Sequence, residues 1–545
     1  MTLEEEAAVA SQLTSFREDQ GTQTVYAAQI SSRFGWDVQA WIRFVEDANG
    51  RPLAEARNMY EEFLLVFPMS VRYWRVYLER EMDAKNFEGV EKLFRRCLEK
   101  VPHVQLWQTY LTYCSINAST QEDGNRVLRD AYEYALLHTR HDIESTPIWK
   151  DYLHFLKELP TTTHNEINER ASGIRETYDR AIATPMVNLE DIWSDYRSWL
   201  SSQNKAWSKL ADAQSAKLAL SRSVYTERSR LAKSLPLSPL AVPPRDGTAE
   251  TGLKTWKKII RYEKRNRESR LTPLDLRQQV KYAYKQSLMM LLHYPEMWFD
   301  YAKYLIDESL PEEALLVYQQ AISYLPGNSL LHFSYADLLE SMDRPKEARE
   351  VYHALLAVKQ DSLIRIQFMF FEHRVSGINA ARKVFLKARK DPNCTYHVYI
   401  ASAMMEFYRN KDAEQARKVF MLALNTEFGS EIDFVVHYLK FLWNLNEVQN
   451  TRAMFERVLS SMPPENIKMI WNLYLEFEYA CGDANTVAHL ERRRAEVYPL
   501  DDQNGILALV NRHRYEDLWP CDKPTLDSFS TLWVIGGLGL ITRVV

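Results

Sequence analysis

The stretch WFDYAKYLIDESLPEEALLVYQQAISYLP, residues 298–326, contains the pattern that determines the fold. Trp298 and Tyr301 stand three residues apart in its first half, and Ala314 and Tyr318 stand four residues apart in its second half. Positions i, i+3, i+4 and i+7 share one face of a helix with 3.6 residues per turn, so each half predicts an amphipathic helix. The small alanine lets the paired helix approach closely, while the aromatic side chains fill the space beside it. The stretch therefore predicts a unit of two packed helices.

The same unit returns along the chain. Trp74 with Tyr77 and Trp471 with Tyr474 repeat the first-helix spacing, and degenerate copies bring the total to about twelve units. Second-helix copies share a small residue, an arginine and a following aromatic: Ala56-Arg57, Ala381-Arg382, Ala416-Arg417 and Thr451-Arg452. One such pair exposes an apolar face that it cannot cover alone, and stacked neighbours bury it. The sequence predicts an all-α fold, an α-solenoid of about twelve repeats.

Composition agrees with this fold. The 545 residues include only 16 Gly and 21 Pro, which excludes collagen-like and turn-dense all-β chains. Pro311 is expected in the turn of its unit and Pro326 after the second helix, because proline disfavours helical geometry in the preceding residue. The 68 basic and 73 acidic residues give a net charge of −5, so the whole chain is not a polycationic nucleic-acid binder. Five scattered cysteines without a CxxC pair indicate reduced thiols in an intracellular protein, with no zinc site.

A proline-rich segment divides the repeats into two arms. Residues 234–252 contain four prolines and two glycines, and we expect them to form a hinge; the alternative is an insertion loop inside one superhelix. About five repeats precede this segment in residues 25–233, after an N-terminal segment 1–24, and about seven follow in residues 253–500. We expect residues 501–545 to form a capping segment and an atypical apolar tail.

The tail FSTLWVIGGLGLITRVV, residues 529–545, is too short for a membrane span, which needs about 20 residues. We expect an altered C-terminus or a small cap on the solenoid, in preference to a membrane anchor.

No nucleotide-binding loop, HExxH, G-x-S-x-G or calcium-binding loop occurs in the sequence. A glutamate follows the repeat tryptophan by seven residues in three units, at Glu81, Glu263 and Glu478. Because these carboxylates recur at one repeat position, a structural hydrogen bond between helices is favoured over acid–base catalysis. We expect no enzymatic activity, no cofactor and no catalytic or metal-binding residue.

One basic stretch is a candidate for RNA contact or nuclear import. Residues 253–270, LKTWKKIIRYEKRNRESR, carry eight basic residues, among them Lys257, Lys258 and Arg261. The favoured interpretation is the solvated face of a repeat helix, since Trp256 and Glu263 hold their usual repeat positions.

The repeats carry Trp-x2-Tyr where a tetratricopeptide repeat carries W-x2-L-G, and three of them add the later glutamate. This pattern resembles the half-a-tetratricopeptide (HAT) repeat, which is typical of RNA-processing scaffolds. Particular strings are similar to the suppressor-of-forked family, the HAT-repeat scaffold subunit of cleavage stimulation factor. In chain order they are PMVNLEDIWSDY (185–196), VPP followed by TWKKIIRYEKRN (255–266), HYPEMWFDYAKYL (293–305), NTRAMFERVLSSMPPE (450–465) and VNRHRYEDLWPCD (510–522).

The resemblance implies a nuclear, non-catalytic scaffold in pre-mRNA 3′-end cleavage and polyadenylation. It implies homodimerisation through the C-terminal HAT domain, residues 253–500. It also implies partners: an RNA-recognition-motif subunit, a WD40 subunit and the polyadenylation specificity complex, with RNA held mainly through them. In the family, a Pro-rich extension follows the R-Y-x-D-L-W-P-C-like segment and holds the RNA-binding subunit, whereas this sequence has the apolar tail there. If the chain is complete, we expect this tethering to be lost or to be taken over by another surface. The alternatives are a HAT scaffold of the spliceosome or of rRNA processing, and a solenoid that binds RNA directly.

Overall fold

The computed structural model describes residues 35–118, 123–160, 164–203, 208–235, 240–244, 248–266, 271–463, 467–499, 501 and 505–525. These residues are predominantly helical, and the only β-type pairing among them is an isolated bridge between Tyr515 and Leu518. The predicted all-α solenoid is confirmed.

Helices α2 to α25 follow one another as twelve consecutive pairs. Five pairs precede the predicted hinge, residues 234–252, and the other seven begin with α12, whose first residue lies inside that segment. The first five pairs are α2 (Val38–Asn49) with α3 (Leu53–Val66), α4 (Val71–Asp83) with α5 (Phe87–Lys100), α6 (Val104–Ala118) with α7 (Gly124–Thr139), α8 (Thr146–Glu158) with α9 (His164–Ile182), and α10 (Leu189–Gln203) with α11 (Ser208–Ala232). The next seven are α12 (Thr248–Lys264) with α13 (Pro273–Met290), α14 (Pro295–Asp307) with α15 (Pro311–Tyr324), α16 (Ser329–Ser341) with α17 (Pro345–Val358), α18 (Ser362–Ser376) with α19 (Ile378–Ala388), α20 (Tyr396–Tyr408) with α21 (Ala413–Leu424), α22 (Ile432–Asn444) with α23 (Val448–Ser461), and α24 (Lys468–Cys481) with α25 (Ala484–Val497). A short helix, α26 (Ile506–His513), follows the last pair.

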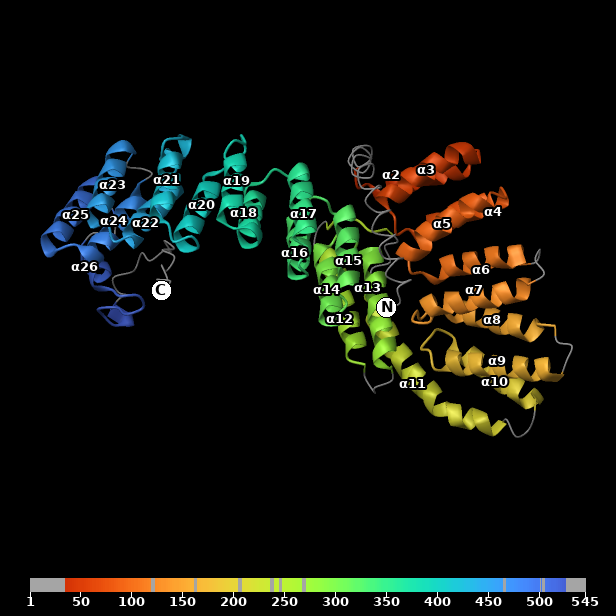
Figure 1. Cartoon of the computed structure of the whole chain (residues 1–545). Coiled ribbons are helices and arrows are strands. Elements are labelled where there is room, and N and C mark those ends of the chain that lie inside the picture. The colour runs from red at the N-terminus through yellow and green to blue at the C-terminus, as the bar shows by residue number, and fades with distance from the viewer. Residues whose placement is uncertain are drawn as a thin grey trace. The chain divides into compact units, whose positions relative to one another are not determined.

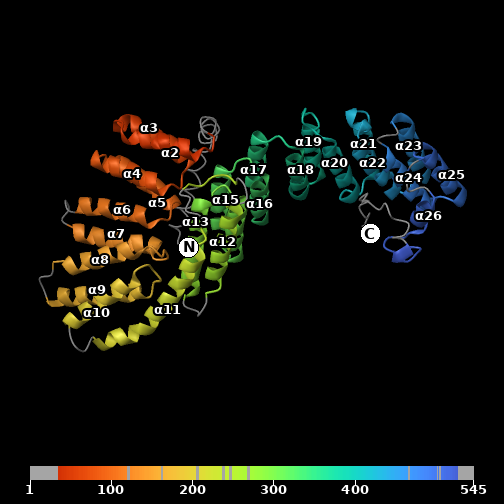
Figure 2. The same ribbon diagram turned by 180° about the vertical axis from the view of Figure 1, so that it is seen from behind.

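The chain divides into two compact units, Met1–Val351 and Tyr352–Val545. In the first unit, α2 to α10 lie side by side in one stack, and α11 leads from its end to α12 and α13 (Figure 1). In the second unit, α18 to α25 form a stack of the same kind, which Figure 2 shows from behind. One continuous apolar cluster runs through this second stack from Met369 to Leu490. Each helix pair thus buries its apolar face against its neighbours, as the repeat pattern requires.

Aromatic side chains join several repeats to the next one along the chain. The aromatic residue of a second helix packs against the tyrosine of the following first helix. The ring centroids lie 5.0 Å apart for Tyr60 and Tyr77, and 4.4 Å apart for Phe455 and Tyr474. The repeated aromatic spacing therefore encodes contacts between units as well as packing inside one unit.

The turns between the two helices of a unit share a backbone conformation. One residue in each of several turns has a positive φ of 56–61° although it is not glycine: Lys85, Ser309, Asp343, Lys411 and Asn446. A left-handed residue is a common way to end a helix, and glycine is the residue that adopts it at least cost. The next helix often begins at once: Pro311, expected in the turn, is instead the first residue of α15, where its missing N–H would have no intrahelical partner.

The repeat tryptophan does more than fill space. The indole Nε1 of Trp298 donates to the carbonyl oxygen of Leu292 at 2.8 Å, and that of Trp74 donates to the carbonyl oxygen of Pro68 at 2.8 Å. In both cases the acceptor lies six residues earlier, in the connection that leads into the helix. The tryptophan thus binds the connection between units to the first helix, a contact that phenylalanine could not make.

The helices that flank the predicted hinge pack against one another. Helix α12 begins at Thr248, inside residues 234–252, and Leu240 and Ala241 of the connecting segment are buried. The segment therefore carries buried apolar contacts. Its action as a hinge, and with it the division into two arms at this point, stays a prediction.

Helix α13 also contacts the first stack directly. The carboxylate of Asp142 accepts hydrogen bonds from the Tyr282 hydroxyl at 2.6 Å and from the Gln286 amide at 2.9 Å. Arg140 and Asp275 form an ion pair of 2.7 Å beside them. Burial raises the pKa of Tyr282, so its hydroxyl remains a donor at neutral pH. Residues on both sides of the predicted hinge are thus joined by polar contacts, of which the hydrogen bond from Tyr282 to Asp142 is buried.

Candidate interaction surfaces

The predicted repeat-core residues all lie inside the protein. Their side chains are buried and form the contacts between stacked helices: Trp74, Tyr77, Trp298, Tyr301, Ala314, Tyr318, Trp471 and Tyr474. These residues position the helices, and a partner would meet the side chains on the outer faces of the same helices.

The recurring glutamate accepts hydrogen bonds from an arginine of the preceding repeat. Arg57 of α3 donates to both carboxylate oxygens of Glu81 in α4, at 2.6 and 2.9 Å. Three further pairs repeat this two-bond contact from a second helix to the next first helix: Arg228 with Glu263, Arg382 with Glu406 and Arg452 with Glu478. We call each of these four contacts an Arg–Glu clamp. In all three predicted glutamates the carboxylate is thereby engaged between helices.

The clamp also fixes the ionisation of its members. The hydrogen bond from Arg57 lowers the pKa of Glu81, although burial acts in the opposite direction. The hydrogen bond to Glu81 likewise raises the pKa of Arg57. Both groups are therefore charged at neutral pH, which suits a structural pair and not a proton-transfer site.

Sequence reasoning found these glutamates but not their arginine partners. The signal was present, because Arg57, Arg382 and Arg452 each follow the small residue of the second helix. Reading both repeat positions together would have predicted the pairs.

The basic stretch is partly compensated within the protein. Lys257 pairs with Glu296 at 2.9 Å and with Asp300 at 3.7 Å, both on α14. Its hydrogen bond to Glu296 raises the pKa of Lys257. Lys258 and Arg261 are exposed on the same helix. The structure thus brings Lys257 to an acidic neighbour and leaves the other two at the surface, while residues 267–270 lie outside the described residues.

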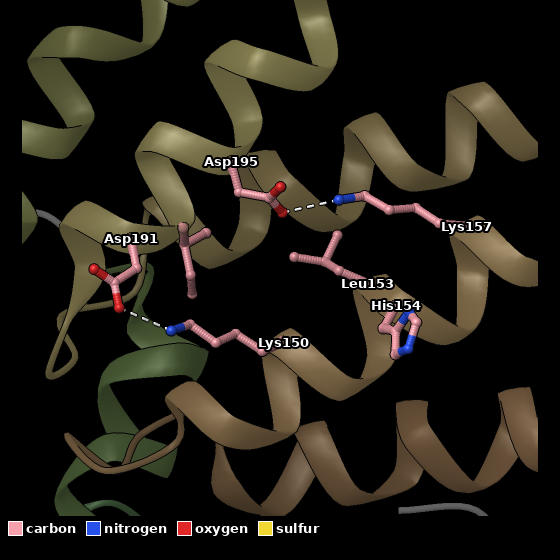
Figure 3. Close-up of a pocket in the computed structure, with 7 residues that line it drawn as sticks. Lys150, Leu153, His154, Lys157, Asp191 and Asp195 are labelled. Atoms are coloured by element: carbon pink, nitrogen blue, oxygen red, sulfur yellow. Dashed lines mark hydrogen bonds and ion pairs between the residues drawn. The ribbon is translucent and has the colours of Figure 1, made fainter.

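A hollow of about 390 Å³ lies between α8 and α10. Two ion pairs cross it, Lys150 with Asp191 and Lys157 with Asp195, each at 2.8 Å (Figure 3). Burial alone would raise the pKa of Asp195, but hydrogen bonds from Lys157 and Tyr178 lower it. Because both lysines already bind an aspartate of the next repeat, we interpret this hollow as a polar contact between two neighbouring repeats.

No group of three or more His, Cys, Asp or Glu side chains in the described ranges is arranged to hold a metal ion. None of the described helices is both long and apolar enough to cross a membrane. All five cysteines are free thiols. The expectation that the chain has no enzymatic activity stays a prediction.

Helix pairs stacked within each of the two compact units, joined by aromatic contacts and Arg–Glu clamps, define a helical-repeat protein of the HAT class. The profile of the suppressor of forked protein family matches residues 22–526, so this chain belongs to that family.

Curated relatives extend the comparison. The chain is 35% identical over 487 residues to cleavage stimulation factor subunit 77 of Arabidopsis thaliana, covering 87% of this chain and 66% of the relative. It is 32% identical over 560 residues to the protein suppressor of forked of Drosophila melanogaster, covering 92% and 73%. The mRNA 3′-end-processing protein RNA14 of Yarrowia lipolytica is 32% identical, with 88% of this chain and 64% of the relative covered. The chain thus spans about two thirds of the length of these relatives.

Among solved structures, the crystal structure of CstF-77 is similar with a TM-score of 0.55 and 21% identity. The match covers 78% of this chain and 88% of that one. This likeness supports the shared fold.

Proposed function

We propose that this chain is a non-catalytic scaffold subunit of the machinery that cleaves and polyadenylates pre-mRNA 3′ ends, and that it acts in the nucleus. The observation that carries the proposal is the match to the mRNA 3′-end-processing protein RNA14 of Yarrowia lipolytica over 88% of the chain, beside the match to cleavage stimulation factor subunit 77 over 87%. The family profile also extends to residue 526 and so includes residues 510–522, a segment outside the repeat core that HAT periodicity alone does not require.

The finer proposal concerns partners. The chain bridges an RNA-recognition-motif subunit, a WD40 subunit and the polyadenylation specificity complex, and it dimerises through residues 253–500. A stack of helix pairs supports such a role because it offers long continuous faces on which partner segments can lie. Dimerisation would double each attached partner, so weak contacts gain from high effective concentration.

RNA is held mainly through the partners in this proposal. The pairing of Lys257 with Glu296 and Asp300 supports this, since it reduces the positive charge that α12 can offer to RNA phosphates. The charge-reversal variant Lys258→Glu with Arg261→Glu tests the alternative of direct RNA binding. We expect unchanged affinity of the purified chain for single-stranded RNA across a salt series. A large loss of affinity with a shallower salt dependence would favour the direct-binding alternative.

Affinity purification from nuclear extract followed by mass spectrometry tests the main proposal. We expect cleavage and polyadenylation subunits to co-purify, and light scattering of the full chain to give the mass of a dimer. Recovery of splicing or nucleolar proteins in their place would contradict the proposal, and a monomeric mass would contradict its dimer component.

A further inference from the structure

The C-terminal end of the described repeats exposes a group of apolar side chains. Ile506 and Leu509 lie three residues apart on one face of α26, and Tyr515 and Leu518 follow in a tight turn closed by two backbone hydrogen bonds. Their exposed fractions are 51%, 49%, 61% and 66%. We call these four residues the terminal patch.

The segment that carries the patch is held in place by its other side chains. Val510 is buried, and Arg512 of α26 lies 4.0 Å from Glu491 of α25. The guanidinium of Arg514 lies over the Trp519 ring at 4.9 Å. Helix α26 is therefore docked beside α25, and the exposure of Ile506 and Leu509 is a property of this docked helix.

An exposed apolar end is unusual for this architecture. Terminal units of a solenoid need a polar outer face, because no further repeat covers them. Contiguous exposed apolar residues commonly mark a surface that another segment covers. We therefore expect another segment to cover the apolar side chains of α26 and of the turn that follows it.

We propose that residues 529–545 of the same chain cover the terminal patch and act as the cap of the solenoid. These residues, FSTLWVIGGLGLITRVV, lie outside the described residues, and Arg543 is their only charged side chain. Their composition matches the patch: aromatic and aliphatic side chains occur in both, and Arg543 is the only charged side chain of residues 529–545 that would be desolvated.

Chain length allows this contact. Ten residues separate Leu518 from Phe529, and at about 3.5 Å per extended residue they span about 35 Å. A tether of this length gives the tail a local concentration on the order of millimolar at the patch. A tail of the same chain therefore has a large advantage over a partner that is free in solution.

Hydrogen exchange measured by mass spectrometry tests the proposal, with three proteins compared: the full chain, a chain ending at Thr525, and the full chain with Leu509→Glu and Leu518→Glu. Truncation should speed amide exchange in residues 506–518 several-fold. The double variant should speed exchange in residues 529–545. The matched control Leu330→Glu, which changes an exposed leucine of the other unit, should alter neither segment.

Unchanged exchange of residues 506–518 after truncation would overturn the proposal, because it would show that the tail does not cover the patch. Photo-cross-linking from photo-leucine, incorporated into a mixture of isotopically light and heavy chains, separates the remaining occupants. Links between residues 506–518 and 529–545 should join peptides of the same label. Mixed-label links would assign the patch to a second copy and overturn the intramolecular cap. Tail-dependent sedimentation with phosphatidylcholine vesicles, without an effect on residues 506–518, would overturn it in favour of a membrane contact.

Discussion

The guanidinium group of Arg228 donates two hydrogen bonds, each 2.7 Å long, to the carboxylate of Glu263, and both side chains are only 6% exposed. The pair connects α11 to α12 across the proline-rich segment that sequence analysis assigned to a hinge. The same clamp joins Arg57 to Glu81 within the first stack, where consecutive helices follow without an insertion. The contact between consecutive repeats is therefore maintained across the longer connection from α11 to α12.

Substitution of Glu263 by glutamine should strongly destabilise the contact between α11 and α12. Removing one charge of a buried pair leaves the other uncompensated, which costs about 3–5 kcal/mol. We expect Glu263→Gln to lower the free energy of local opening by this amount, measured by hydrogen exchange of α11 and α12. The exposed pair of Arg96 and Glu61 provides the control, and Glu61→Gln should cost less than about 1 kcal/mol. Equal effects of the two variants would show that burial of the pair is unimportant.

The indole hydrogen bond of the repeat tryptophan gives a second prediction. Trp298→Phe removes the donor to the Leu292 carbonyl and should cost about 1–3 kcal/mol beyond the loss of ring area. Trp471 is the matched control because its indole Nε1 is buried and makes no hydrogen bond within the described residues. Trp471→Phe should therefore be less costly, as measured by urea denaturation of each variant. A larger effect at Trp471 would contradict the role of the hydrogen bond.

The left-handed turn residues predict a stabilising substitution. Ser309 is exposed and has a φ of 61°, a conformation that costs a side-chain-bearing residue about 1–2 kcal/mol. Ser309→Gly should raise the free energy of unfolding by up to about 1 kcal/mol, since glycine also has more freedom to lose on folding. Lys303→Gly, at an exposed position inside α14, should instead lower it by about 1 kcal/mol. Thermal unfolding of both variants would test the sign of each effect.

The helix pairs and their core could be predicted from the sequence because period and side-chain size determine them. Ala314 and Tyr318 lie on one buried face of α15, as their spacing predicts. The role of the recurring glutamate was also inferable, since a carboxylate at a fixed repeat position serves the stack and not a single site. Its partner could be inferred only by reading two repeat positions together, because Arg57 lies 24 residues before Glu81.

Other features depend on contacts that periodicity does not carry. The docking of Tyr282 against Asp142 joins residues 140 positions apart, and no repeat rule relates them. The pairing of Lys257 with Glu296 depends on which faces of α12 and α14 meet. The sequence shows a basic stretch there, whereas the structure shows that Lys257 and Lys254 in this stretch are already paired with acidic side chains.

Acid titration distinguishes a clamped glutamate, whose pKa is lowered, from a buried glutamate whose pKa is raised. The hydrogen bond from Arg57 holds the pKa of Glu81 below its unfolded value of about 4.3, so its contribution to stability is present above that pH and is lost as the pH falls through the lower folded pKa. The difference in unfolding free energy between the wild type and Glu81→Gln should be constant from pH 7 to about pH 5 and shrink below about pH 4.

Glu476 supplies the control of opposite sign. Burial raises the pKa of Glu476, although the charges of Arg514 and Lys440 act in the opposite direction. The folded state therefore loses stability as the pH rises from the unfolded pKa through the higher folded pKa. Glu476→Gln should therefore be more stable than the wild type at pH 7, with an advantage that disappears on acidification. Denaturant unfolding at a series of pH values measures both differences. The assignment of Glu81 as a clamped carboxylate would fail if both differences in unfolding free energy changed with pH in the same direction. Pairing with Arg57 stabilises ionised Glu81, whereas burial destabilises ionised Glu476, so the two differences should have opposite slopes.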